Sequence, residues 1–98
     1  MENQQDIEIH VPPPVAAGSY ANLVGVWHSP HDFALDFCLV QPFAADGPQA
    51  TVVSRVRIPP TLVLNLLQSL SQNLLEYEKT YGEVRRPYGD HEKGGDDR

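Results

Sequence analysis

The sequence predicts a small α+β domain, in which a three- to four-stranded antiparallel meander is covered by one long C-terminal amphipathic helix. Short segments of alternating or continuous apolar residues lie between positions 7 and 58, and Pro, Gly or Asp turns separate them. Residues 60–81 instead repeat apolar side chains at intervals of three and four. The length of 98 residues allows one core at most. We expect a flexible N-terminus at 1–6, a single domain at 7–84 and a disordered acidic tail at 85–98.

The first predicted strand covers residues 7–11, where Ile7, Ile9 and Val11 alternate with polar residues. Three prolines follow it at 12–14 and cannot donate hydrogen bonds to a sheet. This segment is therefore an edge strand or a loosely attached arm, and it could equally reach a second subunit.

The next two strands are predicted to form a hairpin. Residues 19–28 are apolar on both faces, which indicates a strand buried on both sides, and the turn cluster 28–32 follows. In the third strand the side chains of Phe33, Leu35, Phe37 and Leu39 share one face. A short turn between sequential strands favours antiparallel pairing.

The last strand covers residues 50–58, and strict alternation divides it between two faces. One face carries Ala50, Val52, Ser54, Val56 and Ile58, and the other carries Thr51, Val53, Arg55 and Arg57. Pro60 suits the first position of a helix, and Gly82 suits a left-handed cap at its end. The apolar stripe between them consists of Val63, Leu66, Leu67, Leu70, Leu74, Tyr77 and Tyr81.

Two further leucines of this helix, Leu64 and Leu75, lie more than about 100° around the axis from the centre of the stripe at Leu70. Leucines outside the sheet-facing stripe need another partner, so we interpret them as an interface with a second subunit. The alternative is that they are scattered surface leucines.

The composition limits the classes of function and the locations that we expect for this protein. The net charge is −6 and the pI about 4.9, so the field of the protein repels phosphate backbones. The single cysteine excludes an intramolecular disulfide, and the polar N-terminus lacks the features of a signal peptide. No apolar run approaches the roughly 20 residues of a membrane span. We expect a cytoplasmic protein that is not associated with a membrane.

No residue pattern specifies a catalytic, cofactor or metal site. The weak metal candidates are His28, His31 and Asp32, with His10 as a further ligand, but a solvated turn explains them better. Cys38 lies within a strand and is interpreted as a small apolar filler, in preference to a nucleophile.

Asp36 lies in an otherwise apolar strand, so its carboxylate must find donors or face solvent. We expect a structural ion pair with Arg55 or Arg57 on the next strand, in preference to a catalytic acid. The arginines could instead form a basic face with Arg85, Arg86 and Tyr88, which would suit nucleic acid. Thirteen acidic residues oppose that interpretation.

Several short motifs together resemble a small prokaryotic family, the domain of unknown function 3467. They are Gly18 to Asn22, His28 and Ser29, Phe33 to Phe37, Pro42, Ser54 to Val56, and Asn73, Leu74, Tyr77, Glu78, Tyr81 and Gly82 after Pro60. The resemblance implies a bacterial or archaeal origin and carries no activity. It marks Tyr20, Asn22, Asp36, Arg55 and Glu78 as candidates for a shared surface or a polar network.

From these observations we expect a non-catalytic homo-oligomer, most simply a dimer, that serves as a protein-binding or scaffold module without a cofactor. The alternative is a nucleic-acid-associated regulatory protein that uses Arg55 and Arg57 on a dimer face. A metal-binding protein built around His28 and His31 is the third interpretation.

Overall fold

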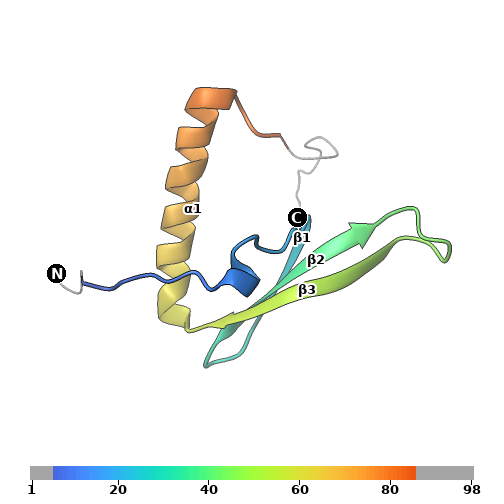
Figure 1. Ribbon diagram of the computed structural model, residues 1–98, viewed down its shortest axis with the longest axis horizontal. Coiled ribbons are helices and arrows are strands. Elements are labelled where there is room, and N and C mark those ends of the chain that lie inside the picture. Colours follow the sequence, from blue (N-terminus) through green and yellow to red (C-terminus); the bar gives the residue numbers. More distant parts are fainter. Residues whose placement is uncertain (1–5, 86–98) are drawn as a thin grey trace. The chain divides into compact units, whose positions relative to one another are not determined.

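The structure, a computed structural model, describes residues 6–85 and contains one sheet and one long helix (Figure 1). In chain order the elements are a 3-10 turn η1 (Pro13–Val15), the strands β1 (Leu23–His28), β2 (Phe33–Gln41) and β3 (Gln49–Ile58), and the helix α1 (Pro60–Tyr81). The α+β class is confirmed. Apart from Asp6 and Arg85, the predicted flexible N-terminus and disordered tail lie outside the described residues.

The three strands form an antiparallel meander in the order β1-β2-β3. The turn between β1 and β2 is closed by the backbone N–H of Ser29, which donates to the carbonyl of Asp32 over 2.9 Å. The hydroxyl of Ser29 also accepts hydrogen bonds from the backbone N–H groups of His31 and Asp32. Ser, Pro and Asp in this turn therefore have a backbone role.

β3 contains a β-bulge, so its residues are divided between the two faces of the sheet differently from the prediction. Phe37 pairs with Ser54, but Cys38 pairs with Val52, so Val53 has no partner on β2. One extra residue reverses the alternation on its far side. The prediction that Ala50 and Val52 share a face with Ser54 is thus wrong, because the bulge places them on the face of Arg55 and Arg57.

The prediction that β1 is buried on both sides is also wrong within the described chain. β1 is an edge strand, and the exposed fraction of its apolar residues runs from 49% for Leu23 to 63% for Trp27. The predicted strand at residues 7–11 is not part of the sheet. The sheet therefore has three strands, the lower end of the predicted range.

The core of the described residues is small. Its buried apolar members are Cys38 and Ile58, and the carboxylate residue Asp36 is buried beside them. No described side chain is completely enclosed. Most apolar residues of the described chain are accordingly at least partly exposed.

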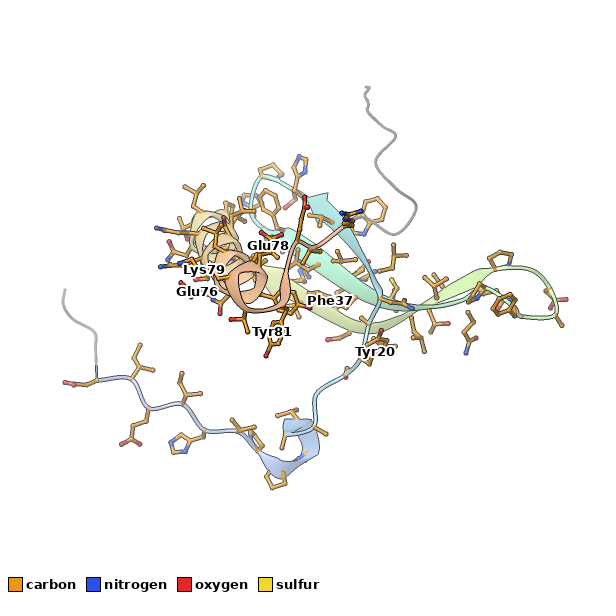
Figure 2. All side chains as sticks on the ribbon, turned by 90° about the horizontal axis from the view of Figure 1, so that it is seen from above. Tyr20, Phe37, Glu76, Glu78, Lys79 and Tyr81 are labelled. Carbon is orange, nitrogen blue, oxygen red and sulfur yellow. The ribbon has the colours of Figure 1, made fainter. Side chains whose placement is uncertain are left out.

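The helix begins at Pro60 and ends at Tyr81, as predicted. Gly82 has the left-handed φ of 100° that favours glycine, and its N–H donates to the carbonyl of Glu78 over 3.0 Å. The carboxylate of Glu78 in turn accepts a hydrogen bond from the N–H of Val84 over 3.0 Å. Figure 2 shows Glu76, Glu78, Lys79 and Tyr81 on the last turns of α1.

The described chain divides between Pro59 and Pro60 into two compact units, the sheet with its N-terminal segment and the helix. No residue of α1 is buried. That the helix covers the sheet within a single domain stays a prediction. None of the helices in the described range is long and apolar enough to cross a membrane.

Candidate functional site

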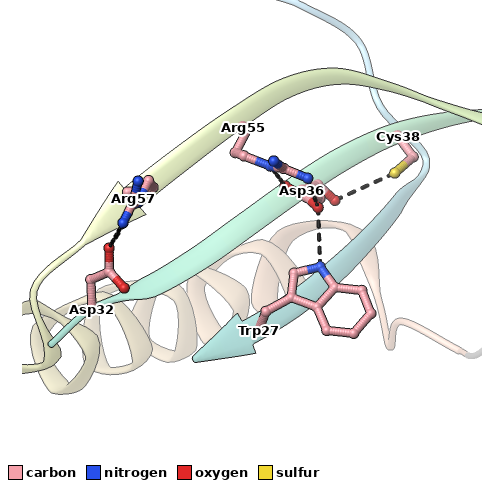
Figure 3. Close-up of polar contacts among 6 residues, drawn as sticks. All are labelled: Trp27, Asp32, Asp36, Cys38, Arg55 and Arg57. Atoms are coloured by element: carbon pink, nitrogen blue, oxygen red, sulfur yellow. Dashed lines mark hydrogen bonds and ion pairs between the residues drawn. The ribbon is translucent and has the colours of Figure 1, made fainter. Parts of the chain in front are cut away.

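One face of the sheet carries Asp36, Arg55 and Arg57, three of the polar residues that the sequence marks as candidates. Asp36 lies at the centre of β2, with Gly25 opposite it on β1 and Arg55 opposite it on β3. Nearer the β1–β2 turn on the same face, Ala34 of β2 pairs with Trp27 on β1 and with Arg57 on β3. We call Trp27, Asp36, Arg55 and Arg57 the polar face of the sheet (Figure 3).

Asp36 is the centre of the polar face. The guanidinium of Arg55 binds its carboxylate in a bidentate manner, with Nε donating to Oδ1 and Nη2 donating to Oδ2 over 2.9 Å. The indole Nε1 of Trp27 donates to the same Oδ2 over 3.0 Å. Only 5% of the surface of Asp36 is exposed, so these donors replace the water that the carboxylate loses. The structure thus selects Arg55, of the two predicted partners, for Asp36.

The indole of Trp27 reaches Asp36 by lying beside Gly25, where only a small side chain would fit. The two residues are diagonal neighbours across β1 and β2, and the indole leans over the position of Gly25. A Cβ at that position would lie 3.8 Å from the indole Nε1, in ordinary van der Waals contact. A methyl group therefore fits, whereas a branched side chain would displace the indole. Glycine thus leaves room for a hydrogen bond between two strands.

These hydrogen bonds favour the charged forms of Asp36 and Arg55. The bidentate bond from Arg55 lowers the pKa of Asp36 below its ordinary value, against a smaller opposing effect of desolvation, and Trp27 lowers it further. The same bond raises the pKa of Arg55. Asp36 is thus a fixed carboxylate at neutral pH, and a general acid would need the opposite shift.

A second pair lies at the turn end of the polar face. Arg57 donates to Oδ2 of Asp32, with Nη2 at 2.6 Å and Nε at 2.8 Å, and the hydroxyl of Ser29 donates to Oδ1 of Asp32 over 2.9 Å. The bonds from Arg57 and then Ser29 lower the pKa of Asp32. Each arginine of this face is therefore matched by one aspartate.

The arrangement holds its side chains in place through hydrogen bonds and ion pairs. An open hollow of about 270 Å³ lies over its turn end, lined by Trp27, His28, Ser29, Asp32, Ala34, Arg55 and Arg57. Cys38 lies nearby, 8% exposed, and its thiol contacts the backbone carbonyl of Asp36 at 3.5 Å. These contacts agree with the interpretation of Cys38 as a structural residue.

Three of the metal candidates, His28, Asp32 and His10, have other side-chain partners. The ring of His28 stacks on Phe33 with 5.5 Å between centroids, and Asp32 is bound by Arg57 and Ser29. His10 lies 3.5 Å from the carboxylate of Glu8, outside this turn. Among residues 6–85, no group of three or more His, Cys, Asp or Glu side chains is placed to hold a metal ion.

Within the sheet unit, the candidate network residues do not form one cluster. Asn22 holds the start of β1 to β2, since its N–H donates to the carbonyl of Cys38 and its side-chain oxygen accepts from the N–H of Val40, each over 2.9 Å. Tyr20 is 76% exposed before β1, and Glu78 closes the end of α1. The structure brings together Asp36 and Arg55 and adds Trp27, which sequence reasoning treated only as apolar. The indole N–H, which needs an acceptor when partly buried, is the signal that could have found it.

The candidate interface residues Leu64 and Leu75 are 74% and 58% exposed on α1. Stripe residues such as Leu67 and Leu70 are similarly exposed, at 58% and 60%. Exposure therefore extends around the helix and is not restricted to the two leucines outside the stripe.

Comparison with known proteins gives a family without an activity. No curated protein and no solved structure shows significant similarity to this chain. The family model described as "Protein of unknown function (DUF3467)" matches residues 1–86, which include every strand and the whole helix. Since that match covers most of the sequence, the chain belongs to the DUF3467 family.

Proposed function

We propose that the protein is a non-catalytic homo-oligomer, most simply a dimer, that serves as a binding or scaffold module for another protein. The supporting observation is the extent of apolar surface left open. Burial of a large apolar side chain contributes about 1.5–3 kcal/mol, whereas ordering the backbone costs about 1–2 kcal/mol per residue. Two buried apolar residues, Cys38 and Ile58, do not offset that cost.

The apolar surface of the sheet supports this proposal. Val24, Val26 and Val56 lie on the face opposite Asp36 and are 49%, 54% and 41% exposed. Phe33, Leu35 and Phe37 lie between them at intermediate exposure. A contiguous apolar surface on a soluble protein is typical of an interaction site.

The helix supports assembly independently. Its leucines extend beyond a single stripe, so one covering surface cannot bury all of them. If the stripe packs on the sheet of its own chain, Leu64 and Leu75 still face outward. A second copy would bury both of them at a two-fold interface, where each patch meets its own equivalent.

The polar face argues for protein binding over nucleic-acid binding. The side chains of Arg55 and Arg57 are 61% and 70% exposed, which is the observation in favour of a nucleic-acid-associated regulatory role. Asp36 and Asp32 neutralise them, however, and phosphate affinity depends on uncompensated positive charge. We therefore keep this role as the second candidate. A salt-dependent shift with DNA or RNA would support it, and the absence of binding at low salt would exclude it.

Size-exclusion chromatography with light scattering tests the leading proposal on the full chain. We expect twice the chain mass of 10.9 kDa at micromolar concentration. A strict monomer under those conditions would remove the argument for assembly. Metal analysis of an untagged preparation addresses the third interpretation, since stoichiometric zinc or manganese would favour a site at His28 and His31.

We place this module in the cytoplasm of a bacterium or archaeon. The free thiol of Cys38 is compatible with that location. Fractionation of host cells with an antibody to the protein would test the location.

A further inference from the structure

The N-terminal arm, residues Ile7–Val11, is built like a strand but has no strand partner among the described residues. It is extended, and no backbone hydrogen bond joins it to another part of the described chain. Its apolar residues Ile7, Ile9 and Val11 are 76%, 86% and 62% exposed. Glu8 and His10 lie 3.5 Å apart, so they share the other side of the arm. Figure 2 shows side chains projecting from both sides of this segment.

The sheet has one edge that is open to another strand. β1 contains no charged residue, no proline and no bulge, and alternate N–H and C=O groups of an edge strand point away from its neighbour. The opposite edge, β3, carries Arg55 and Arg57, contains the bulge at Val53 and is followed by Pro59. Charges and bulges of this kind oppose strand addition. The two edges are thus unequal, and β1 is the receptive one.

The path of the chain directs the arm away from the β1 edge of its own sheet. Between the arm and β1 the chain passes over β2 and β3. There Pro14, Val15, Gly18 and Ser19 border a hollow of about 390 Å³ whose other walls are Phe37, Ser54 and Val56. β1 lies at the other side of the sheet from β3. The arm therefore precedes a segment that borders β2 and β3 and not the free edge of β1.

We propose that the arm Ile7–Val11 of one copy adds to the β1 edge of a second copy as a fourth strand. The proposal rests on the dimer proposed above and assigns it a strand-exchange surface. The lengths match, since five arm residues face the six of β1. Addition would supply hydrogen bonds to two unpaired backbones and would cover apolar residues on both segments. A two-fold axis makes the exchange reciprocal.

Cross-linking between differently substituted copies tests this exchange in the full chain. One protein carries Ile9→Cys and the other Val26→Cys, and the two are mixed and treated with a short bismaleimide. We expect a covalent dimer that contains one chain of each kind and is lost when either substituted protein is replaced by wild type. The wild-type control shows whether the native Cys38, which is buried, forms a cross-link by itself. Val53→Cys on β3 replaces Val26→Cys as the control for the other edge.

Three cross-linking results would overturn the exchange. They are closure within one chain that carries both Ile9→Cys and Val26→Cys, preferential linkage to Val53→Cys, and no linkage in a protein that light scattering shows to be a dimer. A strict monomer would instead remove the proposed function itself.

Substitutions in the arm provide a second measurement. Ile7→Ser, Ile9→Ser and Val11→Ser together should raise the dimer dissociation constant at least about ten-thousandfold, because three apolar side chains are lost from each of two reciprocal contacts. Glu8→Ser with His10→Ser changes the neighbouring residues and should leave the constant within about tenfold. Equal effects of the two sets would contradict the exchange.

Discussion

Replacing Leu64 and Leu75 together by glutamate should dissociate the dimer without unfolding the chain. Leu64 is 74% and Leu75 58% exposed, so each chain has the surface of about 1.3 leucines left to bury. At about 1.5–3 kcal/mol for each buried leucine, that surface is worth about 2–4 kcal/mol per chain. Both chains contribute at a two-fold interface, so the loss is about 4–8 kcal/mol, or at least about a thousandfold in the dissociation constant.

Sedimentation equilibrium of the variant and wild type, with circular dichroism to monitor the helix, measures this effect. Asn65→Glu with Gln72→Glu is the matched control, because it adds the same charge at exposed polar positions of α1. Leucine and glutamate have similar helix propensities, so helix content should not fall. A Leu64→Glu, Leu75→Glu protein that remains a dimer within about tenfold of wild type would refute the assigned interface.

Three further predictions concern the fold. Hydrogen bonds lower the pKa of Asp36 in the folded state, so its stabilisation is present above the ordinary value of 3.8 and is lost as pH falls through the folded-state pKa. The free energy of unfolding in urea should therefore fall less for Asp36→Asn than for wild type when the pH is lowered from neutral to below 3.8. Identical pH profiles of the two proteins would contradict the pairing. Gly82→Ala should lower the free energy of unfolding by about 1–2 kcal/mol because of the left-handed φ, whereas Gly82→Asn should lower it less; equal losses in thermal unfolding would exclude this cause. Gly25→Val should displace the indole of Trp27 and change the emission of this single tryptophan, and Gly25→Ala should not; a matching change in both would show that space at Gly25 does not set the indole position.

Local patterns were sufficient for the helix and for the last two strands. Pro60 and Gly82 bound a helix because one tolerates a missing N–H at the first turn and the other adopts positive φ after the last. The ends of β2 and β3 fell close to prediction because turn residues interrupt each apolar run. These effects depend on residues near in sequence, so they can be read without knowledge of the fold.

The β-bulge at Val53 and the hydrogen bond from Trp27 to Asp36 could not be predicted from local sequence patterns. A bulge inserts one residue between two strands, and Val53 has no composition that marks it. Strict alternation therefore misplaced Ala50 and Val52 and left Arg55 and Arg57 equal as partners of Asp36. The actual pairing with Arg55 follows from the register between strands, which local patterns do not fix.

The misjudged burial of β1 has a related cause. A run of apolar residues is common to central strands and to edge strands that meet another chain. Residues such as Val24 and Trp27 therefore looked like core, although the described chain leaves them half exposed. On the present account, the same residues mark the surface that a second copy covers.

The molecular mass of the full-length protein in solution, measured by light scattering over a range of micromolar concentrations, tests the central proposal most directly. We expect a species of twice the chain mass that dissociates only on dilution. A folded protein that keeps the mass of one chain at every concentration would contradict it.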